Sequence, residues 1–299
     1  MKPNTALPRL GLFLVAFVLF AAGTAFAQSS IHWTTAIRYA KLVKIAEAVE
    51  PTNDYAAADK QAIAALGYTY QQTIYGNDWS SNDEVSADTT VSYGFLATSS
   101  TGELVAVLRG TDTTLEWIDD ALFAFVSNPI KHSSGYTEQG FTKIYKSLRT
   151  GPSASAATVV NAIASKASLG SIASVTVTGH SLGGALSELL TLDVAHNTTI
   201  TKPVVYSFAS PRVGTAGCKD DYNETVTTSY RVYNSADIVP DVPTWPYYQV
   251  NTAFPLFPDS SKVSTSIACS HHLTTYLWLM GQEAGVDAGA LNAECVASN

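Results

Sequence analysis

Apolar residues recur along the chain with two different periods, which predicts that helices and strands alternate. From residue 34 to residue 49 they fall at helical spacing, and the pattern stops before Pro51. Residues 93–98 and 104–109 predict a β-hairpin that turns at Ser100-Thr-Gly102, and its second arm is apolar enough to be a buried strand.

Further along, short strands are separated by segments long enough for crossover helices. Helices are predicted over residues 141–148 and 156–167, and strands over 174–178, 204–208 and 230–233. This alternation predicts an α/β fold with a mostly parallel central sheet covered by helices on both faces. In such sheets functional sites form beyond the carboxyl ends of the strands, so the residues that follow each strand are the candidates for chemistry.

The N-terminus has the layout of a secretory signal peptide. Lys2 and Arg9 precede the apolar stretch 10–22, and Ala25-Phe-Ala27 supplies a small-x-small cleavage pattern. The sequence therefore predicts a signal peptide over residues 1–27, a secreted, extracellular protein, and a single domain over residues 28–299. The alternative is an uncleaved membrane anchor; no second stretch is long enough to span a bilayer.

The net charge of the chain limits which classes of binding partner are expected. The 299 residues carry a formal net charge of −8 with no basic run, which is not the pattern of a protein that binds nucleic acid or anionic membrane surfaces. A neutral substrate is expected. The hydrophobic fraction of 46% is sufficient for one large core.

One motif carries the chemistry. After the strand at 174–178 comes Gly179-His-Ser181-Leu-Gly183-Gly184, followed by an apolar helical run. This is G-x-S-x-G between a strand and a helix, where the glycines permit a sharp turn and the serine stands at its tip. Ser181 is the predicted nucleophile, at the helix N-terminus that favours developing negative charge. His180 is interpreted as a packing residue of this turn.

A serine nucleophile needs a base, and the base needs an orienting acid. The only histidines after position 196 are His271 and His272, and either can be the base. Asp237 is the preferred acid because it lies in a short loop after the strand at 230–233; Asp241 is the second choice. No His-Glu-x-x-His motif or cysteine cluster is present, so neither a metal nor an organic cofactor is expected.

Three cysteines, Cys218, Cys269 and Cys295, allow one internal disulfide and one spare thiol. We predict the Cys269–Cys295 pair, which would tie the tail beside the candidate histidines. None of the three follows a strand in the position of a nucleophile.

Four short motifs, in order, resemble the class 3 (fungal lipase-like) lipases. They are Arg109-Gly-Thr111, Gly179-His-Ser-Leu-Gly-Gly-Ala185, Ala236-Asp-Ile-Val-Pro240 and His272-Leu-Thr-Thr-Tyr276. The resemblance implies an α/β-hydrolase fold and the triad Ser181, Asp237 and His272. It favours His272 over His271 because the family histidine is followed by a Leu-Ser/Thr-x-Tyr-type segment.

The resemblance also assigns an oxyanion hole and a lid. The oxyanion hole consists of the backbone N–H groups of Leu182 and Thr111; independently, Thr111 follows a strand, and Gly110 permits close approach. The segment after Thr111 corresponds to the lid that covers the site in this family. Its predicted substrate contacts are apolar side chains at helical spacing: Leu115, Trp117, Ile118 and Leu122. The alternative is a fixed cover.

One position departs from the family pattern. Glu138 stands where many members have the histidine of a Val-His-x-Gly-Phe motif, which leaves the triad intact but weakens any detailed transfer of substrate preference. The aromatic stretch 240–258 is interpreted as an apolar pocket wall or as loop packing.

The combined prediction is a secreted serine esterase that hydrolyses neutral esters, foremost acylglycerols at a lipid–water interface. Feruloyl-type and phospholipid esterases are alternatives with the same triad. A non-catalytic lipid- or glycan-binding protein is an alternative of another class, and a protease is the weakest candidate.

Overall fold

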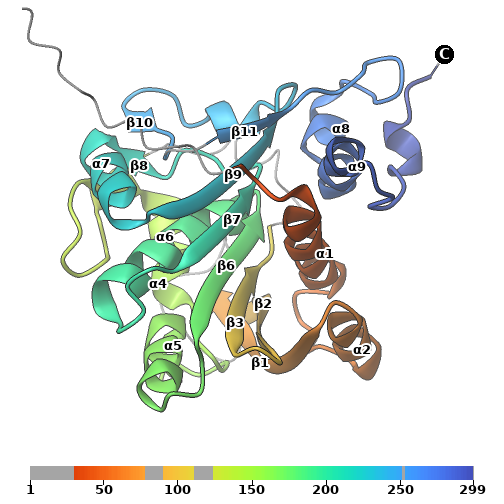
Figure 1. Ribbon diagram of the computed structural model, residues 1–299. Coiled ribbons are helices and arrows are strands. Elements are labelled where there is room, and N and C mark those ends of the chain that lie inside the picture. The colour runs from red at the N-terminus through yellow and green to blue at the C-terminus, as the bar shows by residue number, and fades with distance from the viewer. Residues whose placement is uncertain (1–29, 78–89, 111–123, 251–252, 299) are drawn as a thin grey trace, which may run out of the picture. The chain divides into compact units, whose positions relative to one another are not determined.

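A seven-stranded, mostly parallel sheet forms the centre of the fold (Figure 1). The computed structural model describes residues 30–77, 90–110, 124–250 and 253–298. In spatial order the strands of this sheet are β1 (Tyr68–Asn77), β2 (Thr90–Ser99), β3 (Glu103–Leu108), β6 (Ser174–His180), β7 (Val204–Phe208), β9 (Thr228–Asn234) and β11 (Ala253–Leu256). The pairs β1–β2 and β2–β3 are antiparallel, and every pair from β3 to β11 is parallel.

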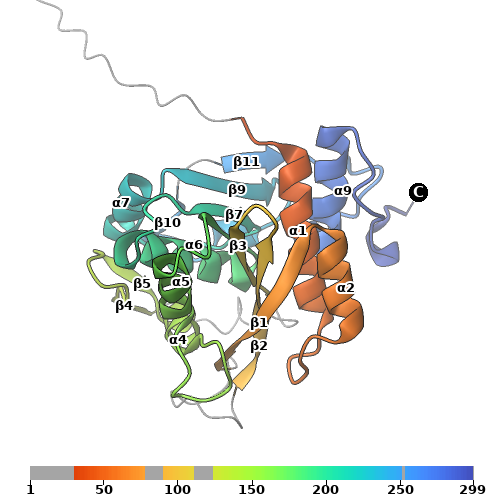
Figure 2. The same ribbon diagram turned by 60° about the horizontal axis from the view of Figure 1, so that its bottom comes forward.

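Helices cover both faces of this sheet, as the periodicity predicts. Figures 1 and 2 show α4 (Gln139–Ser147), α5 (Val159–Ser168) and α6 (Leu182–Asn197) on one side. On the other side lie α1 (Trp33–Ala48), α2 (Ala57–Ala65) and α9 (Leu273–Ala284). The short helix α8 (Ile267–His271) directly precedes α9, and α7 (Ala216–Thr225) precedes β9.

Each face of the sheet has its own hydrophobic core. One core joins Leu104 and Val177 of the sheet to Ile144, Ile163 and Leu186 of the helices. The other joins different side chains of the same strands, such as Val105 and Val107, to Leu42 and Met280. A strand that is buried on both faces is apolar at nearly every position, which explains the continuous apolar run of β3.

The predicted mostly parallel sheet and the individual elements are confirmed. Helices α1, α4 and α5, the β2–β3 hairpin and strands β6, β7 and β9 lie within a few residues of the predicted bounds. The pattern of apolar residues does not predict β1, α2 or a second, four-stranded sheet. That sheet has the order β10 (Tyr247–Tyr248), β8 (Gly214–Thr215), β5 (Tyr136–Glu138) and β4 (Phe125–Ser127).

Part of the stretch 240–258 is strand rather than loop, because it contributes to both sheets. Its residues Tyr247–Tyr248 form β10, and Ala253–Leu256 form β11 at the edge of the large sheet. Proline is tolerated in an edge strand, so Pro255 fits β11. Because proline is not typical of strands, the sequence pattern does not predict β11. Trp245 and Phe257 are 81% and 71% exposed, so they do not line an enclosed apolar wall.

The predicted Cys269–Cys295 disulfide is present, and Cys218 is a buried free thiol whose pKa is raised to about 12 by burial. The disulfide ties α8 to the 3₁₀ turn Ala293–Cys295 near the C-terminus. Residues Ile31–Asn299 form one compact unit. Within the described ranges no helix has the length and apolar character needed to span a bilayer.

Candidate active site

Ser181 stands at a strained turn between β6 and α6. Its backbone angles are φ 56° and ψ −126°, a conformation that non-glycine residues rarely adopt and that clusters at functional sites. Its N–H donates to the carbonyl of Phe208 at 3.0 Å, which anchors the turn to the neighbouring strand β7.

The flanking glycines are required by close backbone approach. A Cβ on Gly179 would lie 2.1 Å from the carbonyl oxygen of Gly183. A Cβ on Gly183 would lie 2.3 Å from the carbonyl oxygen of Leu108 at the end of β3. The turn therefore excludes side chains at both positions, as the G-x-S-x-G pattern predicts.

The turn places the Ser181 hydroxyl at the N-terminus of α6, which begins at Leu182. Unpaired N–H groups at this end of a helix favour negative charge. Ser181 is 1% exposed, and its Oγ forms no hydrogen bond within the described part of the chain.

Asp237 lies just beyond the carboxyl end of β9, as predicted. Its Oδ1 accepts from the N–H of Val239 at 3.0 Å. Its Oδ2 accepts from His271 Nδ1 at 2.8 Å and from the hydroxyl of Tyr276 at 2.7 Å. These three donors hold the buried carboxylate in one orientation.

The expectation that His272 partners Asp237 is wrong, because His271 occupies that position. The His272 ring is exposed; its Nδ1 accepts from the backbone N–H of Thr274 at 3.2 Å, which caps α9. Helix α8 ends at His271, and His272 is extended, with φ −63° and ψ 133°. Adjacent side chains at the junction of α8 and α9 point in different directions. His271 therefore contacts Asp237, whereas His272 does not.

His271 has the protonation geometry of a general base. A carboxylate only accepts hydrogen bonds, so Nδ1 carries the proton and neutral His271 keeps a lone pair on Nε2. That Nε2 is buried and has no hydrogen-bond partner in the ranges the structure describes. Burial lowers the pKa of His271, and the Asp237 carboxylate offsets only part of this effect.

His180 does more than pack, contrary to the interpretation from the sequence. Its ring lies against that of His271, with 4.8 Å between ring centroids, which also places His271 beside the Ser181 turn. His180 Nδ1 lies 2.9 Å from Oε1 of Glu47 on α1, and its Nε2 lies 2.8 Å from the backbone carbonyl oxygen of His271. No sequence signal marked Glu47, since its partner is 133 positions away.

The second-choice acid, Asp241, is not at the site. Its Oδ1 accepts from Arg212 at 3.1 Å, and its side chain is 79% exposed. Asp237 and His271 are instead 4% and 5% exposed.

Tyr276 and Asn234 complete the support of this site and were not singled out as functional residues. The Tyr276 hydroxyl accepts from the Asn234 backbone N–H at 3.0 Å while it donates to Asp237. The Asn234 side chain donates to the carbonyl of Ser270 at 2.8 Å. Tyr276 was visible as the last residue of the motif at 272–276, whereas Asn234 had no comparable signal.

Of the two predicted oxyanion donors, only Leu182 lies within the described residues. Leu182 is buried directly after Ser181, as the first residue of α6. Thr111 lies outside the described residues, but Gly110 before it packs closely on the turn, since a Cβ there would lie 3.3 Å from Ser181 Cβ. The predicted lid contacts also lie outside the described residues: Leu115, Trp117, Ile118 and Leu122.

Glu138, which replaces the family histidine, caps a helix. Its carboxylate accepts from the N–H of Phe141 at 2.7 Å at the start of α4. Burial raises the pKa of Glu138, although backbone N–H groups at this helix terminus oppose the effect.

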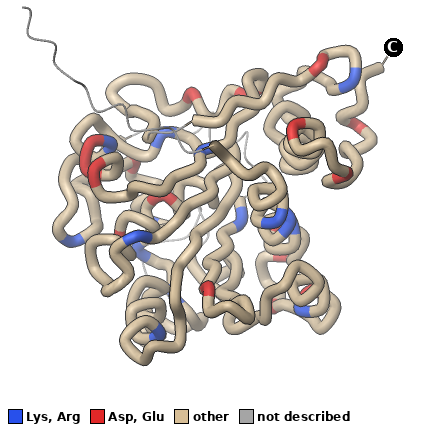
Figure 3. The backbone as a smooth tube through the Cα atoms, in the orientation of Figure 1, with Lys and Arg blue, Asp and Glu red and all other residues tan. Residues whose placement is uncertain are grey.

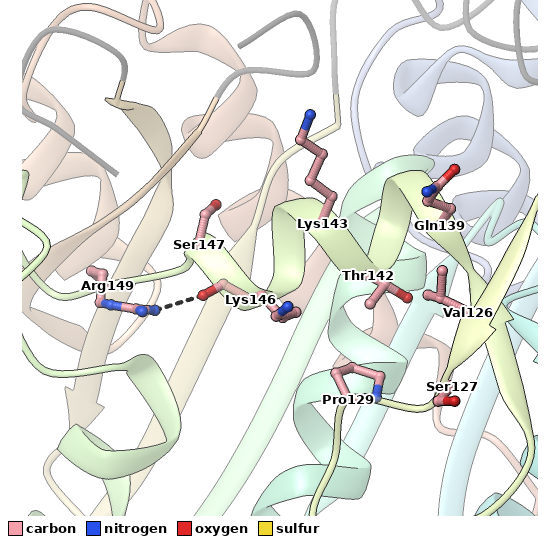
Figure 4. Close-up of a pocket in the computed structure, with 9 residues that line it drawn as sticks. All are labelled: Val126, Ser127, Pro129, Gln139, Thr142, Lys143, Lys146, Ser147 and Arg149. Atoms are coloured by element: carbon pink, nitrogen blue, oxygen red, sulfur yellow. Dashed lines mark hydrogen bonds between the residues drawn. The ribbon is translucent and has the colours of Figure 1, made fainter. Parts of the chain in front are cut away.

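A separate open groove of about 770 Å³ lies along α4 and β4 (Figure 4). It contains Lys143, Lys146 and Arg149, and none of Ser181, Asp237 or His271 lines it. No cluster of His, Cys, Asp and Glu in the described ranges has the arrangement of a metal site.

Comparisons with known proteins show similarity to lipases and phospholipases. Residues 105–247 match the family described as Lipase (class 3). A phospholipase A1-II 6 of rice (Oryza sativa subsp. japonica) is 30% identical over 215 residues, which cover 62% of this chain and 52% of the relative. A chloroplastic phospholipase A1-Igamma3 of Arabidopsis thaliana is 27% identical, over 65% of this chain and 45% of the relative. The chain thus spans about half the length of the curated relatives it matches.

Solved structures show the same fold. The lipase of Rhizomucor miehei in complex with its propeptide superposes with a TM-score of 0.59 at 20% identity, over 87% of this chain and 82% of that chain. A lipase of Yarrowia lipolytica gives a TM-score of 0.58 at 20% identity, over 79% of this chain and 83% of that chain. The architecture is therefore the α/β-hydrolase fold of the fungal lipases, as predicted.

Proposed function

Because residues 105–247 match the Lipase (class 3) family, we propose that the chain hydrolyses lipid carboxylic esters with Ser181, His271 and Asp237 as its catalytic residues. The observation that carries the proposal is the His271–Asp237 hydrogen bond of 2.8 Å beside the strained Ser181 turn. It supplies an oriented base next to a serine that the fold presents at a helix N-terminus.

In the proposed reaction His271 Nε2 takes the proton of the Ser181 hydroxyl as Oγ attacks the ester carbonyl carbon. Asp237 holds the ring in the required tautomer and stabilises the imidazolium that forms. The protonated His271 then gives its proton to the leaving alcohol, which produces an acyl-enzyme. Water repeats the two steps and releases the acid.

The negative charge on the former carbonyl oxygen needs donors. We propose the backbone N–H of Leu182 at the start of α6 as one, supported by its place directly after Ser181. The N–H of Thr111 remains the predicted second donor.

The decisive test is Ser181→Ala. Removing the nucleophile should lower kcat by about 10⁴- to 10⁶-fold while the fold is retained. Hydrolysis of a chromogenic ester and covalent labelling by a fluorophosphonate probe are the measurements. Ser187→Ala, in the same helix, is the matched control and should keep both activities. Full hydrolysis by cleanly purified Ser181→Ala would refute the proposal, and an unlabelled wild-type protein would favour a non-catalytic binding role.

We propose acylglycerols as the main substrates, because the chain is acidic and a neutral ester suits it best. Phospholipids are the second candidate, since the curated relatives carry phospholipase A1 names. A panel of a triacylglycerol, a phosphatidylcholine and a feruloyl ester, with initial rates compared at equal acyl concentration, separates these substrates. Hydrolysis of the feruloyl ester alone would contradict both candidates.

We also propose that the protein is secreted. The Cys269–Cys295 disulfide suits an oxidising compartment, and the N-terminal pattern of charged, apolar and small residues suits a cleaved signal peptide. The test is the N-terminal sequence of protein from culture medium, which should begin at Gln28.

A further inference from the structure

The site contains a second charged pair that the reaction above does not use. Glu47, near the end of α1, and His180, at the end of β6, meet at 2.9 Å, and the His180 ring lies beside that of His271. The His180 side chain is 7% exposed and that of Glu47 is 25% exposed. Residues from three distant parts of the chain thus converge on one point: Glu47, His180 and His271.

The hydrogen-bond partners of His180 determine its protonation. Both partners are acceptors, namely the Glu47 carboxylate and the backbone carbonyl of His271. A neutral imidazole has only one N–H, so His180 must be the doubly protonated cation in order to donate to both.

The electrostatics of the pair agree with this assignment. Burial alone would lower the pKa of His180, but the Glu47 carboxylate, together with the His271 backbone carbonyl and the Asp237 carboxylate, outweighs burial and raises that pKa. Burial would likewise raise the pKa of Glu47, yet His180 and the backbone N–H of Gly110 lower it. Each partner is therefore held in its charged form by the other.

The second proton of His180 is the functional one. Its Nε2–H donates to the backbone carbonyl of His271, whose own ring lies against the His180 ring. This bond restrains the peptide unit of His271, whereas the Asp237 contact is made through Nδ1 of the ring. The Asp237 bond orients the ring, whereas the His180 bond fixes the backbone from which the ring extends.

We infer that Glu47 and His180 form a positioning pair, which holds the His271 backbone so that its imidazole stays beside the Ser181 turn. The inference rests on the proposed function, since it assumes that His271 is the base. Neither Glu47 nor His180 touches the reacting atoms in this role. Both act through His271.

The first test is His180→Phe, which keeps a ring of similar size but removes both hydrogen bonds. The expected result is a fall in kcat of roughly 10- to 100-fold with KM nearly unchanged, because the misplaced base affects the chemical step rather than binding. The rate of fluorophosphonate labelling should fall by the same factor. His196→Phe is the matched control, since His196 forms a comparable contact with Asp221 at 3.1 Å elsewhere in the molecule; it should leave both rates unchanged.

Two substitutions of Glu47 separate positioning from simple packing. In Glu47→Gln the amide can donate to His180 Nδ1, so a neutral His180 still donates from Nε2 to the His271 carbonyl. This variant should keep kcat within about threefold of the wild-type value, whereas Glu47→Ala removes the partner that fixes the orientation of the His180 ring and should lose part of the kcat that His180→Phe loses. Equal losses in Glu47→Gln and Glu47→Ala would contradict the positioning role.

Thermal unfolding distinguishes a catalytic effect from loss of fold. The double variant Glu47→Gln/His180→Phe leaves no unpaired charge, so its Tm should recover relative to His180→Phe while its kcat stays low. Recovery of kcat together with Tm would overturn the inference, and so would a His180→Phe variant with wild-type kcat. If the wild-type protein itself is neither active nor labelled, the proposed function fails instead, so the two failures are distinguishable.

Discussion

At the scale of single residues, His271 and His272 share a peptide bond but have different surroundings. His271 is buried against Asp237, whereas His272 is exposed and caps α9. We predict that His271→Ala lowers kcat on the order of 10⁴- to 10⁶-fold, as expected when a triad base is removed. His272→Ala should keep kcat near the wild-type value and cost about 1 kcal/mol of stability through loss of the cap. Steady-state kinetics and thermal unfolding of the two variants check this, and the reverse ranking would restore His272 as the base.

The burial of His271 also determines how activity depends on pH. The proposed base acts only when His271 is neutral, and burial lowers its pKa below the ordinary value of 6.5. Activity should therefore be full above pH 6.5 and fall as the pH drops through the lowered pKa, where the ring becomes protonated. A profile of kcat/KM against pH should show an acid limb with its midpoint below 6.5, with circular dichroism confirming the fold at each pH. A midpoint clearly above 6.5 would contradict the assigned environment of His271.

How much of the site the sequence could predict depends on the range of the interaction. Ser181 and Asp237 follow predicted strands, so local pattern located both. The choice between His271 and His272 depends on where α8 ends, a boundary that pattern places only to within a few residues. Glu47 and His180 meet across 133 positions, and no local signal predicts such a pair.

At the scale of elements, the contact between the α6 N-terminus and the end of β3 explains why Gly183 is required. A Cβ at this position would lie 2.3 Å and 2.6 Å from the carbonyl oxygens of Leu108 and Arg109, which are backbone atoms that cannot move away cheaply. We predict that Gly183→Ala displaces the Ser181 turn, costs about 1–3 kcal/mol of stability through overpacking and lowers the rate of fluorophosphonate labelling.

Gly217 offers a matched comparison, because it holds the same second position in α7 that Gly183 holds in α6. A Cβ there would come no closer than 3.2 Å to Gly135. Gly217→Ala should therefore change the free energy of unfolding by less than Gly183→Ala and leave labelling intact. Equal effects of the two variants on labelling and denaturant unfolding would show that close approach at the turn is not what Gly183 provides.

The strands differ in how well the sequence pattern predicts them. A continuous apolar run identified β3, because a strand that is buried on both faces has a strong signal. Short runs of β-branched or aromatic residues identified β6 and β7. Strands β8 and β10 are not predicted, since two-residue strands have no periodicity, and Pro255 hides the strand pattern of β11 at the sheet edge. Nonetheless, the strands that position Ser181 and Asp237 belong to the part that pattern predicts well.

At the scale of the whole molecule, the burial of Ser181 and the charge distribution constrain how substrate arrives. In the view of Figure 3, Lys and Arg lie interspersed with Asp and Glu along the described part of the chain, and the formal net charge is −8. Long-range attraction of an anionic surface is therefore not expected. A neutral lipid surface can instead drive binding through apolar contact.

Ser181 is 1% exposed, so an ester can reach it only after some part of the protein moves. If contact with a lipid surface stabilises the open state, the population of that state rises when such a surface forms. We predict that the rate on a neutral short-chain triacylglycerol rises abruptly as its concentration passes the solubility limit. The measurement is the initial rate across that limit, with His271→Ala as the background and a water-soluble ester as the control without an interface. A smooth saturation curve through the limit would mean that opening occurs in solution and that the surface contributes nothing to it.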